Sequence, residues 1–428
     1  MTEKEFNEYI ERINVRGIVP GLGSILNLLN RMGNPQDKMK YVHIAGTNGK
    51  GSLSAYTANI LKAAGYKAGL YTSPCICDYR EKIQINGHMI TKKALYEGMS
   101  YIKSITDEIE KEGIPCPTLF EVETALAFWY FDNNQCDIVV LECGLGGEED
   151  ATNIIKNPLV AGFVSISMDH MMILGDSLDK IATAKSGIIK DGCDVVTCMQ
   201  KTEVSQVLQE KARKTGSCII TAKAPEKIKR KVDSQIFDYV EYKKLEISMG
   251  GGFQPENASE AIEIIKCLIN KGFDISEKHI RKGLKDTWLP ARFSVLSKKP
   301  LIISDGAHNE GAAIRLAQSM DEYLNGKPMV FIMGMLRDKE CEKVVALTAP
   351  KAVAIVTLTP PENPRALEAV ELAKMAGKYC TNVTTADSVE EAVEIAKILA
   401  GDKCIIVAFG SLSYQGRLIN VTKKCHCK

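Results

Sequence analysis

The stretch "HIAGTNGKGS", residues 43–52, decides the fold prediction. An apolar run over residues 41–45 predicts a buried strand that leads into it. An amphipathic run over residues 51–64 predicts a helix that follows it, with Gly65 as the C-terminal cap. Strand, glycine-rich turn and helix in this order place backbone N–H groups and a helix N-terminus where they can bind an anion.

The spacing of this loop differs from the common phosphate-binding loop G-x-x-x-x-G-K-[ST]. Only two residues separate Gly46 from Gly49, and Gly51 lies between Lys50 and Ser52. The glycines allow close backbone approach, the lysine can neutralise phosphate charge, and the serine can bind a metal or phosphate. A tight turn with a surface lysine is the weaker interpretation. The loop therefore predicts a site for the phosphates of a nucleotide.

The rest of the chain alternates strand-like and helix-like runs, which predicts βαβ units and a mainly parallel sheet. We expect further strands over residues 68–72, 137–143, 160–166 and 195–198, and helices over residues 118–132, 256–270 and 276–285. Residues 222–256 are either an antiparallel excursion or a connection. We expect a larger N-terminal domain with a parallel sheet like that of P-loop ATPases, residues 1–294. A smaller Rossmann-like α/β domain over residues 295–428 contains four further strand-like runs.

Composition excludes several classes of protein. The 428 residues carry a formal net charge of +1 without clustered basic charge, so nucleic acid is not an expected partner. No apolar run reaches the ~18 residues of a membrane span, and no signal peptide is present, so we expect a cytoplasmic protein. Most of the 14 cysteines are expected to be small core residues. The pairs Cys75–Cys77 and Cys425–Cys427 could bind a soft metal, although neither has the spacing of a zinc site.

Three polar side chains follow successive predicted strands, where ligands of parallel sheets collect. They are Ser73, Glu142 and His170, and together they form a plausible magnesium shell completed by water. Lys185 lies on the next predicted helix, and beside magnesium it should be neutral or modified, for example as a carbamate. The alternative is a solvent-facing lysine that pairs with Asp179 or Asp191.

The second domain carries "DGAHN", residues 305–309, at the end of its first predicted strand. We expect Asp305 and His308 to face the interdomain cleft, with Arg292 before them at the boundary and Asn257 at the start of an earlier helix. Polar edges suit an adenine or ribose, and an arginine suits phosphate.

These residues resemble the folylpolyglutamate synthase and dihydrofolate synthase group of Mur-type ligases, and the resemblance covers most of the chain. The matching motifs are "GNPQ" (33–36), "HIAGTNGKGS" (43–52), "YTSP" (71–74), "FE" (120–121), "ECGLGGEEDATN" (142–153), "SMDHMMILG" (167–175), "AKSGIIK" (184–190), "PAR" (290–292), "DGAHN" (305–309) and "GSL" (410–412). The short glycine loop is a form that this group shares.

The resemblance implies an ATP-dependent ligase that adds L-glutamate to the γ-carboxylate of a reduced folate, tetrahydrofolate, through an acyl phosphate. It implies ATP, two magnesium sites and a monomer, with Lys50, His170 and a carbamylated Lys185 in catalysis. Magnesium ligands would be Ser73, Glu142, His170 and Lys185; ATP contacts would be Gly46, Thr47, Asn48, Gly49, Lys50, Gly51, Ser52, Asn257, Arg292, Asp305 and His308. Whether dihydropteroate is also an acceptor is left open.

The sequence departs from the common family pattern near the expected pterin and glutamate pockets. The departures are Glu148-Glu149 where Arg-Leu is common, Ala184 for glutamate, Cys75 for histidine, Ala291 for glycine and Phe253 for histidine. Two alternatives stay open. One is another Mur-type amide ligase, against which the lack of an extra domain before residue 40 counts. The other is a nucleotide-binding regulatory module without catalysis, which Lys50, Glu142, His170 and Lys185 together disfavour.

Overall fold

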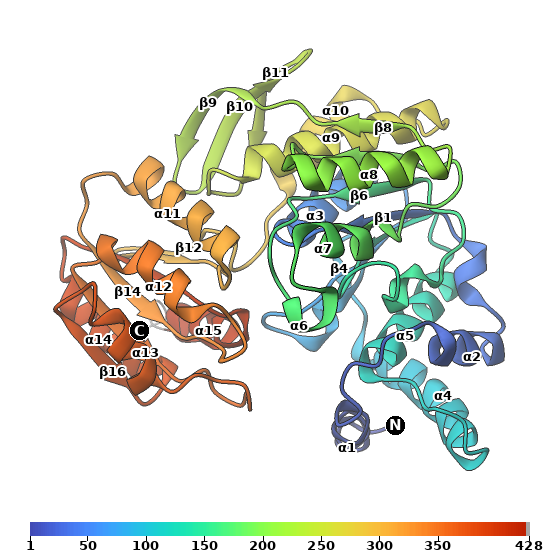
Figure 1. The fold of residues 1–428 in the computed structure, drawn as a ribbon, viewed down its shortest axis with the longest axis horizontal. Coiled ribbons are helices and arrows are strands. Elements are labelled where there is room, and N and C mark those ends of the chain that lie inside the picture. Colours follow the sequence, from blue (N-terminus) through green and yellow to red (C-terminus); the bar gives the residue numbers. More distant parts are fainter. Residues whose placement is uncertain (425–428) are drawn as a thin grey trace. The chain divides into compact units, whose positions relative to one another are not determined.

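The computed structural model describes residues 1–424 and separates into two compact units (Figure 1). The first unit contains Met1–Cys75, Arg80–Ala224 and Glu256–Leu284, and the second contains Ile76–Tyr79, Pro225–Pro255 and the chain from Lys285 onward. The units are thus interleaved along the chain, and the predicted division at residue 294 stays a prediction. The Cys425–Cys427 pair lies outside the described residues.

The first unit is built on an eight-stranded sheet with the order β4-β3-β2-β5-β1-β6-β7-β8. All neighbouring strands from β2 to β8 in this order are parallel, and β3 and β4 are added antiparallel at one edge. The central strands β1 and β5 are buried at every position, as their continuous apolar sequences require. The strands are β1 Tyr41–Ala45, β2 Ala68–Tyr71, β3 Ile83–Ile85, β4 His88–Met89, β5 Ile138–Glu142, β6 Val160–Phe163, β7 Asp194–Thr197 and β8 Ile219–Thr221.

Helices connect these strands. The first helix after the glycine loop begins at Lys50, ends at Ala63 and is followed by Gly65 at φ +91°, which agrees with the sequence prediction within one residue. The α-helices are α1 Glu3–Asn14, α2 Gly23–Arg31, α3 Lys50–Ala63, α4 Lys92–Lys111, α5 Leu119–Asn133, α6 Met171–Leu174, α7 Leu178–Ser186, α8 Thr202–Lys214, α9 Gln254–Asn270 and α10 Glu277–Asp286. Short 3₁₀ helices are η1 Pro35–Lys38, η2 Tyr79–Lys82 and η3 Ala151–Ile154.

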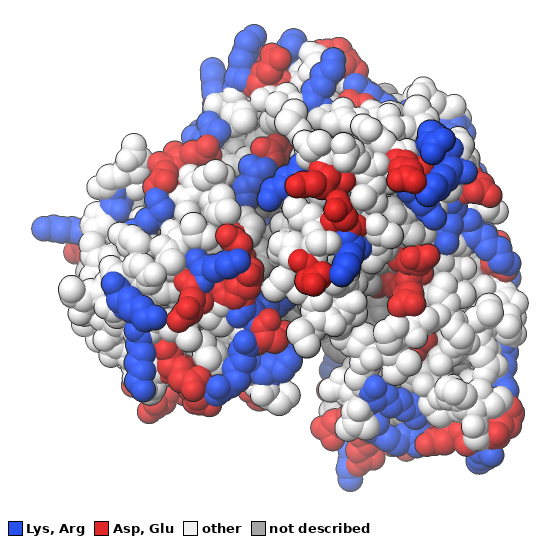
Figure 2. Space-filling model, viewed as in Figure 1, with Lys and Arg blue, Asp and Glu red and all other residues white. Residues whose placement is uncertain are grey.

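Residues 225–255 contain an antiparallel sheet, which confirms the first of the two interpretations of this segment. Its order is β11-β10-β9, with β9 Glu226–Lys231, β10 Ser234–Tyr239 and β11 Tyr242–Ile247. Phe237 and Leu245 are paired across the strands and buried. The basic run in β9 is largely exposed and is a solvated face. Figure 2 shows that basic and acidic side chains are interspersed on the face drawn, which agrees with a net charge near zero.

The second unit also contains a six-stranded sheet with the order β12-β13-β17-β14-β15-β16, parallel except for β12. Its strands are β12 Ser294–Lys298, β13 Leu301–Ser304, β14 Met329–Met333, β15 Ala354–Leu358, β16 Val383–Ala386 and β17 Ile405–Phe409. Its α-helices are α11 Glu310–Leu324, α12 Cys341–Thr348, α13 Ala369–Ala376, α14 Val389–Ala400 and α15 Gln415–Lys424, and its 3₁₀ helices are η4 Ala349–Lys351 and η5 Leu412–Tyr414. The α/β architecture with two mostly parallel sheets is confirmed.

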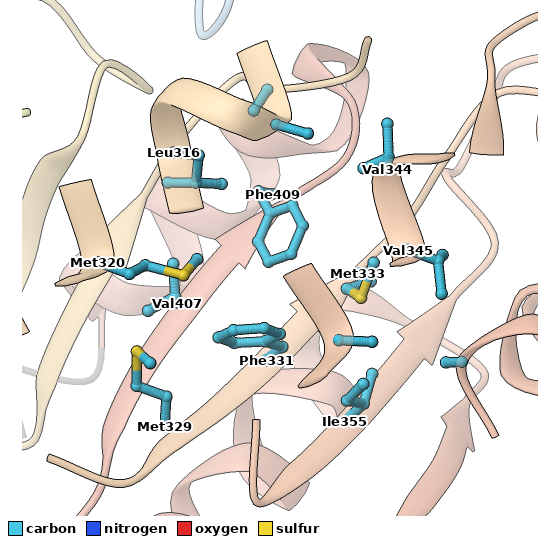
Figure 3. Packing of buried hydrophobic residues seen from close by; sticks show 14 of the residues in the cluster. Leu316, Met320, Met329, Phe331, Met333, Val344, Val345, Ile355, Val407 and Phe409 are labelled. Carbon is cyan, nitrogen blue, oxygen red and sulfur yellow. The ribbon is translucent and has the colours of Figure 1, made fainter. Parts of the chain in front are cut away.

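Apolar side chains cover both faces of the six-stranded sheet. On one face, Phe331 of β14 and Phe409 of β17 meet edge to face with ring centroids 5.1 Å apart. Leu316 and Met320 of α11 and Val344 and Val345 of α12 pack on the same cluster (Figure 3). This packing holds the carboxyl end of β13, where the predicted ATP contacts of this unit lie, on a rigid sheet.

Candidate active site

The glycine loop joins the end of β1 to the first turn of α3. Gly46 has φ +134°, and a Cβ at this position would lie 2.3 Å from Cγ2 of Val164. Gly49 caps α3 with φ +108°, and a Cβ there would lie 2.8 Å from Oδ1 of Asn257 on α9. Both positions therefore require glycine for backbone conformation and for space. The second distance also places Asn257, a predicted ATP contact, against the loop.

The loop is fastened to the segment that follows β6. The Thr47 amide donates to the Ser165 carbonyl at 2.8 Å, and Asn48 forms an isolated antiparallel bridge with Ser165. The Thr47 hydroxyl donates to the Ser167 carbonyl and accepts from the Ser167 amide, each at 3.1 Å. Because this segment continues to His170, the loop and the histidine are held by one hydrogen-bonded piece of chain.

Two lysines converge on the loop. Nζ of Lys50 donates to the carbonyl oxygens of Gly46 and Thr47 at 3.2 and 3.3 Å. Nζ of Lys185, at the end of α7, donates to the Gly46 carbonyl at 2.8 Å. Lys185 is only 5% exposed, so the alternative of a solvent-facing lysine is wrong. Burial, reinforced by the charge of Lys50, lowers the pKa of Lys185 to about 7.

Glu142 is the last residue of β5, and Ser73 lies two residues after the end of the neighbouring parallel strand β2. Tyr71 of β2 is in register with Leu141 of β5, so Ser73 and Glu142 both lie at the carboxyl edge of the sheet. Glu142 is also in register with Ile44 of β1, close before the glycine loop. The Glu142 side chain is buried. The structure therefore brings Ser73, Glu142 and the loop to one edge of the sheet, as the order of strands predicts.

His170 is the N-cap residue before α6 and lies in the left-handed region, with φ +51°. Its Nε2 lies 3.9 Å from Oδ2 of Asp169, and its side chain is more than one-third exposed, whereas Asp169 is largely buried. The negative charge of Asp169 raises the pKa of Lys185, against the larger lowering by burial, so Asp169 belongs to the surroundings of this lysine. No role was predicted for Asp169. A carboxylate directly before the histidine in "SMDH" is the signal that could have found it.

A buried polar network supports the chain after Glu142. His43 of β1 lies 2.7 Å from the hydroxyl of Thr152 and 3.1 Å from the sulfur of Cys143. Thr152 donates to Asp150, and Asp150 accepts from the Leu145 amide at 2.7 Å. Burial lowers the pKa of His43 to about 3, so the imidazole is neutral. The hydrogen bonds of this network hold the turn after Glu142 in place.

The unmodified side chains of the predicted site supply only part of a coordination shell for magnesium. Within residues 1–424, no group of three His, Cys, Asp or Glu side chains is placed to hold a metal ion. The predicted set has only Glu142 and His170 of these types, and Ser73 contributes a hydroxyl. A carboxylate on Lys185 would add a hard oxygen donor of the kind that Mg²⁺ prefers, and water would complete the octahedron.

The predicted residues of the second unit form a cluster at the end of β13. Asp305 accepts from the Phe293 and Ala307 amides, both at 2.8 Å. Burial raises its pKa to about 6, and the charge of Arg292 opposes that rise. A Cβ on Gly306 would lie 2.6 Å from Nη1 of Arg292, and Nδ1 of His308 lies 2.8 Å from the Gly306 carbonyl. Arg292, Asp305 and His308 are thus brought together.

A parallel sheet that ends in a short glycine loop, with a helix and two convergent lysines, is the site expected of a Mur-type ligase. Residues 44–265 match the Mur ligase middle domain, and residues 291–412 match the Mur ligase glutamate ligase domain. The chain belongs to this class of ligases.

Similarity to individual proteins shows which family of Mur-type ligases the chain belongs to. Over 412 residues the chain is 31% identical to the dihydrofolate synthase/folylpolyglutamate synthase of Bacillus subtilis, covering 93% of this chain and 94% of that protein. It is 35% identical to the folylpolyglutamate synthase of Lacticaseibacillus casei over 354 residues, which cover 80% and 82% of the two chains. The Mycobacterium tuberculosis folylpolyglutamate synthase, solved with ADP and AMPPCP, superposes with a TM-score of 0.89 at 26% identity over 98% of each chain. The chain is a member of the folylpolyglutamate synthase/dihydrofolate synthase family.

Across residues 1–424, no helix combines the length and the apolar character needed to span a bilayer.

Proposed function

We propose that this chain is an ATP-dependent ligase that adds L-glutamate to the γ-carboxylate of tetrahydrofolate, and that it works as a monomer. The observation that carries the proposal is the convergence of Lys50 and Lys185 on the Gly46 carbonyl, inside a loop that leaves no room for a side chain at Gly46 or Gly49. A loop of this kind holds phosphates through backbone N–H groups and one lysine. The family relatives agree with this activity.

The reaction proceeds in two steps. A carboxylate oxygen of the folate attacks the γ-phosphorus of ATP, the bond to the β-phosphate oxygen breaks, and an acyl phosphate and ADP form. The amine of glutamate then attacks the acyl carbon, inorganic phosphate leaves with the former carboxylate oxygen, and the nitrogen loses a proton to give the amide.

In the first step the protein mainly positions charges. The loop from Gly46 to Ser52, with Thr47, Asn48 and Gly51, surrounds the triphosphate, and Lys50 neutralises its developing charge. The Thr47 and Asn48 amides donate to the Ser165 carbonyl and hold the loop in place, so the amides at the start of α3 are the proposed phosphate donors. Magnesium, held at two sites by Ser73, Glu142, His170 and the modified Lys185, would supply further neutralisation of phosphate oxygens. Asn257 lies against the loop, where it can bind the nucleotide.

Lys185 is suited to carbamylation. Only a neutral amine reacts with carbon dioxide, and a pKa of about 7 leaves about half of the amines neutral at pH 7. An ordinary lysine would be almost fully charged at this pH. The carbamate would replace a buried positive charge beside Lys50 with a negative one, which turns repulsion into attraction.

The cluster in the second unit is proposed to bind ATP. Arg292 supplies a guanidinium for phosphate, and Asp305 and His308 supply polar edges for the ribose or base. The hydrogen bonds from the Phe293 and Ala307 amides hold the Asp305 carboxylate in a fixed orientation.

Dihydropteroate is the second candidate acceptor. The Bacillus subtilis relative carries both activities in its name, and both acceptors present a carboxylate to the same phosphoryl group. ADP release should be measured with tetrahydrofolate and with dihydropteroate, each with and without glutamate. The proposal expects glutamate-dependent release with tetrahydrofolate, and release with dihydropteroate would add the second activity. No release with either acceptor would favour a regulatory module instead.

A further inference from the structure

The beginning of α5 contacts the ends of both strands that carry predicted magnesium ligands. The ring of Phe120 lies 6.0 Å from that of Tyr71, the last residue of β2. A Cβ on Gly144 would lie 2.5 Å from Cζ of Phe120, so this ring also covers the turn after Glu142. The first turn of α5 is thus a spacer between the strand ends that lead to Ser73 and Glu142.

A buried ion pair fastens this spacer to β2. The Thr72 amide, next to Ser73, donates to the Lys82 carbonyl at 3.0 Å. Nζ of Lys82 lies 2.5 Å from Oε1 of Glu123 on α5, and the two side chains are 14% and 4% exposed. The Tyr71 hydroxyl adds a contact of 3.2 Å to the hydroxyl of Thr124.

The ion pair is a poor device for stability alone. Removing two charges from water costs about as much as their attraction returns, and apolar residues of similar volume often serve as well. What an apolar pair lacks is direction, because a charge-assisted hydrogen bond fixes the separation and the orientation of its partners. The lysine of this buried, directed pair accepts a hydrogen bond from Thr72, the residue before the proposed metal ligand Ser73, and this connection points to a role in geometry.

We propose that Lys82 and Glu123 are positioning residues that set Ser73 relative to Glu142, and so set the affinity for the magnesium–nucleotide complex. Lys82 acts through its carbonyl on Thr72 and through its ammonium group on α5. This inference rests on the proposed function, since it needs Ser73 at the metal.

Two variants separate positioning from stability. Glu123→Gln keeps the shape of the side chain and removes the negative charge of its pair with Lys82. Lys82→Met combined with Glu123→Leu replaces the pair by apolar side chains and should restore the melting temperature. Asp132→Asn is the matched control, because Asp132 lies near the other end of α5 and pairs with Lys38 at 2.6 Å.

The measurement is calorimetric binding of the non-hydrolysable analogue AMPPCP at increasing Mg²⁺, together with thermal unfolding of each variant. We expect wild-type affinity in Asp132→Asn and about tenfold weaker magnesium-dependent affinity in both pair variants, as for other groups that orient metal ligands. The double variant should show this loss at the melting temperature of the wild type.

Wild-type affinity in Glu123→Gln, or recovery of both affinity and melting temperature in the double variant, would overturn the positioning role. Should Glu123→Gln not fold, the double variant decides in the same way. Absence of magnesium-dependent binding in the wild-type protein would instead count against the proposed function, which keeps the two failures distinct.

Discussion

The ammonium groups of Lys50 and Lys185 donate to the same carbonyl oxygen, that of Gly46, at 3.2 and 2.8 Å. Burial lowers the pKa of Lys185 most, and repulsion by the positive charge of Lys50 at the same oxygen lowers it further. Lys50 is proposed to bind phosphate, so Lys185 is the residue expected to lose its charge.

Lys185→Ala should lose activity, and short carboxylates such as formate or acetate should restore part of it. The added carboxylate would occupy the place of the missing carbamate. Initial rates of ADP release with and without the carboxylate measure the effect. Lys180→Ala, an exposed lysine on the same helix that pairs with Asp176, should keep wild-type rates and show no response. A Lys185→Ala enzyme that no carboxylate rescues would speak against the carbamate.

Lys50→Ala should reduce the rate of ADP release by about 100-fold or more, because one charge-stabilising group at the reacting phosphate is removed. The fold should persist, since Lys50 is only partly buried and its bonds are to loop carbonyls. Lys62→Ala, at an exposed position in the last turn of the same helix, is the control and should behave as wild type. Substantial activity in Lys50→Ala would remove this lysine from the mechanism.

Gly46→Ala should abolish nucleotide binding. The added methyl group would overlap Val164 at 2.3 Å, and φ +134° is strained for alanine, so the loop must move. Gly65→Ala has a positive φ of +91° but no atom within 4 Å of the new Cβ, so it should cost only about 1 kcal/mol of stability and keep binding. Calorimetry with AMPPCP compares the two. Equal affinity in both variants would mean that the loop does not hold the nucleotide.

Asp305 should make stability depend on pH. Its pKa rises from the ordinary 3.8 to about 6 in the fold, so between these values the folded state binds more protons than the unfolded state. Stability from this group is complete below pH 3.8 and is lost as pH rises through about 6. Asp305→Asn lacks this titration.

Denaturant unfolding of the wild type and of Asp305→Asn from about pH 4.5 to about pH 7 checks this sign. The free energy of unfolding of the variant, minus that of the wild type, should increase as pH rises, by at most on the order of 1.4 kcal/mol per pH unit. A difference that does not change with pH would show that Asp305 keeps an ordinary pKa.

Long apolar runs between glycine turns made most of the fold predictable. The bounds of β1 agree with the prediction, and β5 differs by one residue at each end, because both strands are buried throughout. By contrast, β12 and β16 were not predicted. They are the edge strands of the six-stranded sheet, and the polar residues of "SVLSK" and "VTTA" carry no strong pattern. Burial on one side only leaves a weaker signal than burial on both.

Local motifs made the loop predictable, but they did not predict the contacts between residues that are distant in the chain. The bond from Lys185 to Gly46 spans 139 positions, and no local pattern encodes it. The same holds for the ion pair of Lys82 and Glu123, which depends on how α5 packs against β2. The helix predicted over residues 118–132 agrees with α5 within one residue, and the capping box of Thr118 and Glu121 defines its start in the structure.

Transfer of oxygen from the acceptor to phosphate tests the central claim most directly. If the γ-carboxylate of tetrahydrofolate is labelled with ¹⁸O and turned over with ATP and glutamate, the acyl phosphate route passes one labelled oxygen to each inorganic phosphate released. We expect phosphate that carries one ¹⁸O for every amide formed, detected by mass spectrometry or ³¹P NMR. Phosphate without the label, formed together with the amide product, would contradict attack of the carboxylate on the nucleotide held by Lys50 and the glycine loop.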